Sequence, residues 1–183
     1  MLTNTKIEDL IKCPKYIFEA NPKQGMSSDS KSTLIKRKNL KLKSEDETCQ
    51  FTVFMRQNTM LIEQFSIGLL YKLESINFRK VTLIRFNGEH GQTDWSKDNH
   101  YNSFHIHYLN EALLKQRIFE PKLIEITNKF NTFHSALFEF FNHVNIVNFI
   151  DFFQISKSNN VNQGDQDERS DIKHSTRKFS SQN

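Results

Sequence analysis

The most constraining feature of the chain is a period-two alternation of apolar and polar residues in three successive segments, which a fourth strand-like segment follows. In residues 33–43, for example, Leu40 and Leu42 share one parity and Lys41 takes the other. Successive side chains of a β-strand point to opposite faces, so the pattern predicts strands with one buried and one wet face. The segments are residues 33–43, 49–57, 63–74 and 78–86. Short polar connections, beginning with a hairpin turn at residues 44–48, predict an antiparallel meander.

A fifth strand is predicted further along, at residues 104–108. Its sequence FHIHY places His105 and His107 on one face, about 7 Å apart at their Cα atoms from the rise per residue of a strand. Asn87 and Gly88 are expected to end the preceding strand in a turn, because both tolerate positive φ.

Helical spacing appears at both ends of this strand region. Residues 4–12 predict a short helix capped by Thr3 or Asn4. Pro14 opposes a straightforward continuation, and a kinked extension through Tyr16 and Phe18 is left open.

A longer amphipathic helix is predicted within residues 123–146, ending near Asn145. Its apolar residues recur at intervals of three and four, so its apolar face is expected to pack on the sheet. Residues 145–156 are apolar but short, and they predict either a final helical turn or an edge strand. Residues 21–32 carry turn chemistry throughout and predict an exposed loop.

These elements are typical of an α+β domain. We expect an antiparallel meander sheet of four to five strands, with the C-terminal amphipathic helix packed on one face and a short N-terminal helix. At 183 residues the chain fits a single core, expected within residues 1–155. Residues 156–183 are polar and lack apolar periodicity, so they predict a disordered tail.

Cysteine usage and hydropathy indicate a soluble, cytoplasmic protein. Cys13 and Cys49 have no paired spacing, which disfavours a zinc–thiolate centre and a disulfide framework and suits a reducing compartment. Acidic residues interrupt the amino terminus where a signal peptide needs an apolar core. No later run approaches the roughly 18 apolar residues of a membrane span.

The segment from residue 85 to 107 holds four of the seven histidines and the only tryptophan. Imidazole titrates near neutrality and binds transition metals, so His90, His105 and His107 are candidates for a metal or acid–base centre. Asp94, Asp98 and His100 are possible additions to the set. The alternative is that these histidines only bond to neighbouring strands or to solvent. No cofactor is expected apart from a divalent transition metal in the first case.

A ribonuclease-like mechanism is one way to use such histidines. It needs a neutral His to take a 2′-hydroxyl proton, a protonated His to give one to the leaving oxygen, and a cation for the phosphate. His105 and His107, with Arg85 or Arg79, are the clustered candidates. The sequence has no Ser-His-Asp spacing, phosphate-binding glycine loop or HExxH motif, which disfavours other hydrolase, nucleotide-binding and zinc-protease classes.

A basic stretch in the first predicted strand points to nucleic acid. Its cationic residues can line phosphates while Tyr or Phe rings stack on bases. Lysines on a strand also protect a sheet edge from aggregation, and an acidic turn follows directly, so both interpretations stay open. The residues are Lys36, Arg37, Lys38, Lys41 and Lys43.

Two aromatic residues in the polar loop are candidates for partner binding. Trp95 and Tyr101 lie between the predicted fourth and fifth strands. Tryptophan is enriched at binding hot spots, although packing over the sheet is the alternative for Trp95.

Several of these motifs together resemble a family of small proteins catalogued as a domain of unknown function. They are the opening MLT with its short helix and PK, the central RFNGEHG, the later FHIHY and the closing FFNHVNI. The family occurs in AT-rich bacteria, their prophages and mobile elements. The resemblance covers about residues 1–150 and implies no established activity. Residues 109–121 depart from the pattern, being charged and helical-looking where a shorter connection is expected.

Three functions follow as hypotheses, and whether the protein is an enzyme stays open. The setting implied by the resemblance favours a non-enzymatic accessory protein of a phage or mobile element. Such a protein would engage a host protein or ribonucleoprotein, for example a CRISPR effector, through the sheet and residues 89–103. The second is a His-dependent or metal-dependent ribonuclease-like toxin, which a weaker similarity to His-containing toxins of toxin–antitoxin pairs supports. The third is a basic nucleic-acid-binding module. No membrane partner is expected.

Overall fold

The computed structural model describes residues 2–18, 25–29, 32–73, 79–90 and 102–153. The predicted tail, residues 156–183, lies outside them. None of the described helices is long and apolar enough to cross a membrane. The elements, in chain order, are α1 (Asn4–Lys12), β1 (Lys15–Ile17), β2 (Ser27–Asp29), β3 (Ser32–Ser44), β4 (Gln50–Asn58), β5 (Phe65–Lys72), β6 (Lys80–Asn87), β7 (His105–Tyr108), α2 (Glu111–Lys115), β8 (Leu123–Ile126), α3 (Phe133–His143) and the 3-10 turn η2 (Phe149–Asp151).

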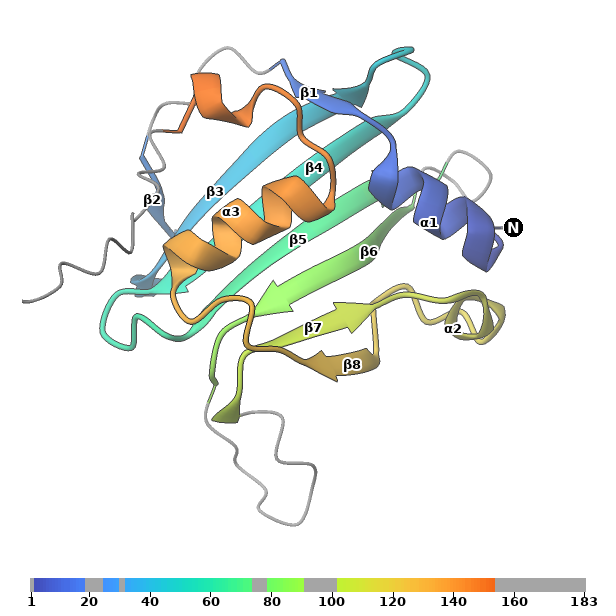
Figure 1. Ribbon diagram of the computed structural model, residues 1–183. Coiled ribbons are helices and arrows are strands. Elements are labelled where there is room, and N and C mark those ends of the chain that lie inside the picture. Colours follow the sequence, from blue (N-terminus) through green and yellow to red (C-terminus); the bar gives the residue numbers. More distant parts are fainter. Residues whose placement is uncertain (1, 19–24, 30–31, 74–78, 91–101, 154–183) are drawn as a thin grey trace, which may run out of the picture.

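The strands form one eight-stranded sheet in the order β1-β3-β4-β5-β6-β7-β8, with β2 paired to another part of β3. Every pairing between these strands is antiparallel. Helices α1 and α3 lie across the same face of the sheet (Figure 1). The α+β class is therefore confirmed. The expected count of four to five strands is too low, because β1, β2 and β8 do not show the alternation by which the others are predicted.

Helix α1 has the expected bounds and is capped by Thr3, whose hydroxyl accepts a hydrogen bond from the Lys6 amide at 3.3 Å. It does not extend through Tyr16 and Phe18. Pro14 follows the helix, and the chain then becomes extended, so that Tyr16 pairs with Lys43 of β3. A proline clashes with a preceding helical turn but is compatible with the start of an extended segment.

Helix α3 runs from Phe133 to His143, inside the predicted range of residues 123–146, and its start is set by a cap. Thr132 and Ser135 form a capping box, in which the Thr132 hydroxyl accepts from the Ser135 amide at 3.1 Å and Ser135 Oγ accepts from the Thr132 amide at 3.0 Å. Residues 123–126 pair with β7 as strand β8. Pairing with the exposed backbone of β7 satisfies hydrogen bonds that a longer helix would leave unmade, and it overrides the helical spacing.

Two further segments differ in part from the predictions. The range 21–32, expected as a loop, contributes the short strand β2. Beyond α3, Ile146 forms a parallel bridge with Lys15 and η2 supplies a helical turn, so each alternative for residues 145–156 holds for a few residues.

The core lies between the sheet and the helices. The Phe86 ring of β6 stacks on Phe130 at 5.1 Å and meets Phe140 of α3 edge-on at 5.2 Å between centroids. Aromatic pairs in these geometries add to the stabilisation from burial alone. Each fully buried aliphatic side chain contributes about 1.5–3 kcal/mol. On the central strands these include Leu40, Leu42, Val53, Ile67 and Leu69. The predicted packing of the Phe-lined helix on the sheet is thus observed.

Strand β6 ends at Asn87 as expected, but neither Asn87 nor Gly88 has the expected positive φ. The Gly88 amide instead donates to the Phe65 carbonyl oxygen at 3.1 Å. Glycine is required there by space, because a Cβ would overlap the Glu63 carbonyl oxygen and approach the Phe65 ring to 2.7 Å.

Candidate functional site

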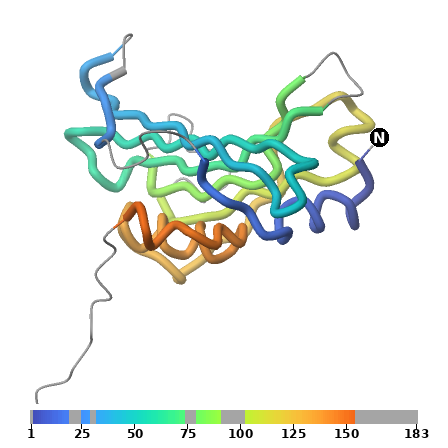
Figure 2. Tube along the Cα trace, turned by 90° about the horizontal axis from the view of Figure 1, so that it is seen from above, coloured from blue at the N-terminus to red at the C-terminus, as the bar shows by residue number. Residues whose placement is uncertain are grey.

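Helices α1 and α3 cover one face of the sheet, and neither of them lies on the other face (Figure 2). Leu42 pairs with Phe51 and Leu40 with Val53, and all four are buried on the helix side. Residues of the opposite parity point away from the helices, and we name their surface the open face. On β3 to β6 the open face comprises Ile35, Arg37, Asn39, Lys41, Lys43, Gln50, Thr52, Phe54, Arg56, Asn58, Ser66, Gly68, Leu70, Lys72, Lys80, Thr82, Arg85 and Asn87.

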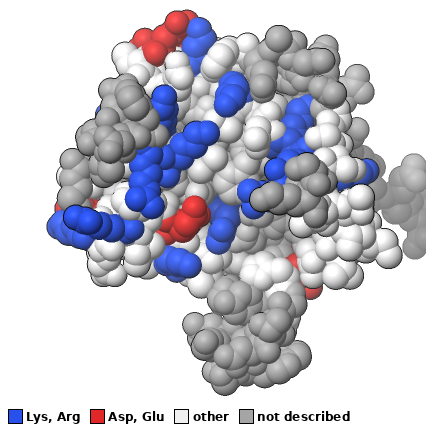
Figure 3. Space-filling model, turned by 180° about the vertical axis from the view of Figure 1, so that it is seen from behind, with Lys and Arg blue, Asp and Glu red and all other residues white. Residues whose placement is uncertain are grey.

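The open face is strongly cationic. None of its described positions on β3 to β6 is Asp or Glu, and Figure 3 shows Lys and Arg side chains spread across it. The nearby Glu120 carboxylate accepts a hydrogen bond from Thr82 Oγ1 at 3.1 Å. The formal net charge of the whole chain is only +4. Clustering of charge on one face, and not the total, therefore creates a surface that attracts polyanions.

The basic residues predicted in the first strand are divided between the two faces. Arg37, Lys41 and Lys43 belong to the open face, whereas Lys36 and Lys38 have the opposite parity. The Lys38 ammonium lies 5.6 Å from the Phe153 ring centroid on the helix side. The five predicted residues therefore do not form one surface. The cationic surface of the open face also includes residues of β4, β5 and β6 that the sequence did not point to.

Arginine and aromatic groups meet at the centre of the open face. Arg37 and Arg56 are directly opposite each other on β3 and β4. This pairing places two guanidinium groups side by side, within reach of one anionic ligand. The Arg56 guanidinium lies 5.4 Å from the Phe54 ring centroid, and Phe54 reaches over Gly68, where a Cβ would overlap the ring. The flat ring is thereby placed among the cations.

The three histidines of the predicted site lie together at the β7 end of the open face. His105 pairs with Asn87 and His107 with Arg85, so the prediction that both share one face is confirmed. The His90 and His105 ring centroids are 5.1 Å apart, and those of His105 and His107 are 4.9 Å apart. The rings therefore form a continuous row.

His105 is held by a chain of hydrogen bonds. Ser66 Oγ donates to Asn87 Oδ1 at 2.9 Å, and Asn87 Nδ2 lies 3.3 Å from His105 Nε2. His105 Nδ1 is 2.7 Å from the Ser103 carbonyl oxygen. One assignment satisfies every group: a neutral imidazole that donates from Nδ1 to Ser103 and accepts at Nε2 from the Asn87 amide.

This arrangement suits a structural histidine better than a catalytic one. A general acid or base needs a ring nitrogen that exchanges a proton with substrate. His105 uses both nitrogens on protein groups and is 0% exposed, and His107 is 7% exposed. The ribonuclease-like mechanism therefore stays a prediction that the described geometry does not favour.

The two candidate cations of that mechanism differ in their surroundings. Arg85 is partly buried opposite His107, and burial is the main cause that lowers the pKa of its guanidinium. The neighbouring Glu120 acts in the opposite direction and Arg56 in the same one. The Arg79 guanidinium instead lies 4.0 Å from the Phe119 ring centroid. Arg85 is thus the cation of the histidine row, and Arg79 belongs to a separate stacking contact.

Metal binding by the histidines also stays a prediction. Among the described residues, no group of three or more His, Cys, Asp or Glu side chains has an arrangement that could hold a metal ion. Five other candidates, Asp94, Trp95, Asp98, His100 and Tyr101, lie outside the described residues.

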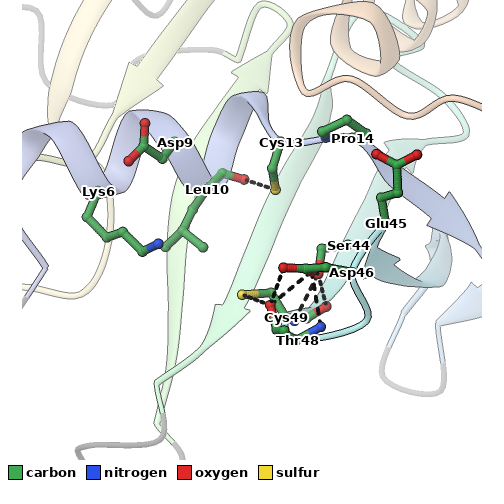
Figure 4. A pocket seen from close by; sticks show the side chains of 10 residues that line it. All are labelled: Lys6, Asp9, Leu10, Cys13, Pro14, Ser44, Glu45, Asp46, Thr48 and Cys49. Atoms are coloured by element: carbon green, nitrogen blue, oxygen red, sulfur yellow. Dashed lines mark hydrogen bonds between the residues drawn. The ribbon is translucent and has the colours of Figure 1, made fainter.

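A pocket of about 370 Å³ brings together the two cysteines, which the sequence analysis treats as unrelated. Cys13 follows α1 and Cys49 precedes β4, and both line this pocket (Figure 4). Cys13 Sγ donates to the Leu10 carbonyl oxygen at 3.5 Å, and Thr48 Oγ1 donates to Cys49 Sγ at 3.7 Å. Spacing along the chain gives no indication of this proximity, because it depends on how β1 pairs with β3.

Acidic and hydroxyl groups on the other wall of this pocket are engaged in a turn. Asp46 Oδ1 accepts from Ser44 Oγ and from the Thr48 amide at 3.1 Å, and these hydrogen bonds hold the pKa of Asp46 below its usual value. The groups on this wall therefore stabilise the β3–β4 turn.

Comparisons with known proteins return nothing: no family model, curated protein or solved structure matches the chain. The resemblance to a domain of unknown function from bacteria and mobile elements stays a prediction.

Proposed function

We propose that this protein binds single-stranded nucleic acid along the open face of its sheet, without catalysing a reaction on it. The observation that carries the proposal is the set of Lys and Arg residues on β3 to β6 with no Asp or Glu at the described positions between them. Neutralising successive phosphates with such residues releases counterions, which is the main source of affinity for nucleic acid of any sequence.

The shape of the surface favours a single strand over a duplex. Phe54 lies among the cations, and aromatic rings on an open sheet stack with unpaired bases, which a duplex keeps inside its helix. His105 and His107 line the β7 end of this surface but are buried. They stiffen the strand pairing in this proposal, and they take no proton from the ligand.

The accessory role in a phage or mobile element, with a host ribonucleoprotein as partner, is compatible with this proposal. The RNA of such a complex would be the group recognised. That biological setting rests on the sequence resemblance alone. Of the alternatives, the ribonuclease-like toxin has the least support from the geometry of the site.

The test measures binding of a fluorescent 20-nucleotide oligo(U) and oligo(dT) by anisotropy at two salt concentrations. If three or four phosphates are engaged, affinity should fall about 20- to 50-fold between about 50 and 200 mM salt. An affinity that does not change with salt would overturn the proposal. RNA and DNA differ in the 2′-hydroxyl, so comparing the two probes shows which is the preferred ligand.

Two matched double variants test whether binding depends on the open face or on the overall charge of the protein. Arg37→Gln with Lys41→Gln removes two charges from the open face of β3, and Lys36→Gln with Lys38→Gln removes two from the opposite face of the same strand. Only the first pair should lower affinity, by about tenfold or more at low salt. Equal losses from both pairs would show that binding depends on overall charge and not on this surface.

A further inference from the structure

At the β1 end of the open face, an aromatic residue continues the cationic surface. Tyr16 pairs with Lys43 and Ile17 with Leu42. Because Leu42 faces the core, Ile17 does so too, and Tyr16 and Phe18 point to the open side. The Phe18 amide donates to the Lys41 carbonyl oxygen at 3.2 Å, which places Phe18 beside Lys41. Phe18 is 50% exposed, so its ring is accessible to a ligand.

A cavity of about 210 Å³ lies next to this ring. Its open-face lining combines apolar, hydrogen-bonding and cationic groups. They are Phe18, Lys41, Gln50, Thr52, Leu70, Lys72 and Lys80. The cavity is smaller than the roughly 300–1,000 Å³ that encloses a whole small molecule, so it fits one unit of a longer ligand.

The cationic rim of the cavity is built from neighbouring strands. Lys72 of β5 and Lys80 of β6 are directly opposite each other, and both are exposed. An anion placed between two ammonium groups on neighbouring strands is within reach of both. Lys43 is also close, with its ammonium 5.5 Å from the Phe18 ring centroid and 2.6 Å from Glu47 Oε1.

We propose that this cavity is a nucleotide subsite of the open face. A base stacks on the Phe18 ring and against Leu70, its edge meets Gln50 and Thr52, and the adjoining phosphate lies between Lys72 and Lys80. The inference rests on the proposed binding of single-stranded nucleic acid and names the place where a base, and not only the backbone, is recognised. Stacking is tolerant of sequence because every base has a π-face.

The experiment uses the full chain and two probes with identical phosphates: oligo(dT) of 20 nucleotides and an abasic strand of the same length. Wild type should bind oligo(dT) at least about fivefold more tightly than the abasic strand, as expected for one stacked base. Phe18→Leu, which keeps apolar bulk without a ring, should lower that preference by about fivefold, and any preference left is that of Phe54. Phe18→Tyr should retain the full preference. Neither change should alter the salt dependence.

A second variant tests the phosphate half of the subsite. Lys72→Gln with Lys80→Gln should reduce the slope of log affinity against log salt by about 0.7 for each phosphate lost. It should leave the ratio between the two probes nearly unchanged, because the ring is still present.

The outcomes distinguish the two proposals. Binding of neither probe would overturn the proposed function itself. Equal binding of oligo(dT) and the abasic strand by wild type, or a Phe18→Leu variant whose preference is undiminished, would overturn the nucleotide subsite while leaving backbone binding intact. Because Phe18 is half exposed, its substitution does not disturb the core, and thermal unfolding of each variant checks this directly.

Discussion

The side-chain ammonium of Lys15 donates to the Val144 carbonyl oxygen at 3.0 Å, joining the first strand to the C-terminal end of α3. The same group donates to the carbonyl oxygens of Ile11 and Cys13, at 2.8 Å each, at the end of α1. Helix C-termini carry partial negative charge and unpaired carbonyls, so one cation between two of them satisfies both. Lys15 is 0% exposed and thus acts as a buried clamp between the helices.

Replacing this clamp should destabilise the fold. Lys15→Met keeps most of the side-chain length but leaves three carbonyl oxygens, two of them in buried hydrogen bonds, without their donor. We expect the free energy of unfolding at pH 7 to fall by about 1–3 kcal/mol, measured by urea denaturation. Lys12→Met is the matched control, because Lys12 donates to the exposed carbonyl of His143 at 3.1 Å. Similar small losses in the free energy of unfolding of both variants would show that Lys15 does not hold the two helices together.

The pH dependence of stability offers a separate test of Lys15. Burial lowers the pKa of its ammonium from 10.5 to about 8. Between these values the unfolded chain binds more protons than the folded one, so stability conferred by this residue rises with pH. Relative to Lys15→Met, wild type should gain about 2 kcal/mol between about pH 8 and 10, and change little below about pH 7. A constant difference across this range would show that the lysine is not desolvated.

The alternation of side chains along the strands was the strongest signal in the sequence. It also predicted which side chains of the candidate site share a face. Alternation between Leu40 and Lys41 predicts which side of β3 faces solvent, and the same logic places His105 and His107 together. Both follow from the backbone geometry of a strand, which depends only on local sequence. The amphipathic stripe of α3 was predictable for the same reason.

Features that depend on pairing between distant segments could not be predicted. Strand β8 is formed because β7 offers an edge to pair with, and its four residues show no alternation that could be set against the helical spacing. The neighbourhood of Cys13 and Cys49 and the clamp of Lys15 both depend on the register of β1 against β3. The cationic surface was only partly visible in the sequence, since Arg56 and Lys72 join Arg37 through the registers of β3 to β6.

Asn87 should be essential for the packing of the histidine row. It is buried and bridges Ser66 and His105. Asn87→Ala removes the donor to His105 Nε2 and the acceptor for Ser66, and we expect a loss of about 1–3 kcal/mol in the free energy of unfolding. Asn39→Ala, at an exposed position of the same face, should change stability by less than about 0.5 kcal/mol. Two equal losses would argue against a structural role for the network.

His143 should make the fold sensitive to mild acid. Burial lowers the pKa of its imidazole from 6.5 to about 4, and the charges of Lys12 and Lys129 act in the same direction. The unfolded chain therefore binds the proton first, and stability should decline as the pH falls from 6.5 toward 4. His143→Gln should flatten this decline in thermal unfolding measurements. His134→Gln, at an exposed position of the same helix, should leave it unchanged, and a profile flattened equally by both variants would remove His143 as its cause.

Three glycines provide a graded test of how tightly the sheet is packed. A Cβ at Gly88 meets the backbone carbonyl of Glu63 and the Phe65 ring, whereas one at Gly25 has nothing within 4 Å. A Cβ at Gly68 meets the Phe54 ring and lies 3.3 Å from the Ile84 carbonyl oxygen.

Backbone atoms cannot move aside as a side chain can. The loss of stability should therefore be largest where the added Cβ meets backbone, smaller where it meets a side chain, and negligible where it meets nothing. Gly88→Ala should lower the free energy of unfolding by about 3 kcal/mol or more, and Gly68→Ala by about 1 kcal/mol as the half-exposed ring rotates. Gly25→Ala should be neutral to within about 0.5 kcal/mol. Urea denaturation of the three variants measures the series. A Gly88→Ala variant as stable as Gly25→Ala would mean that the end of β6 does not approach the β4–β5 connection as closely as this packing requires.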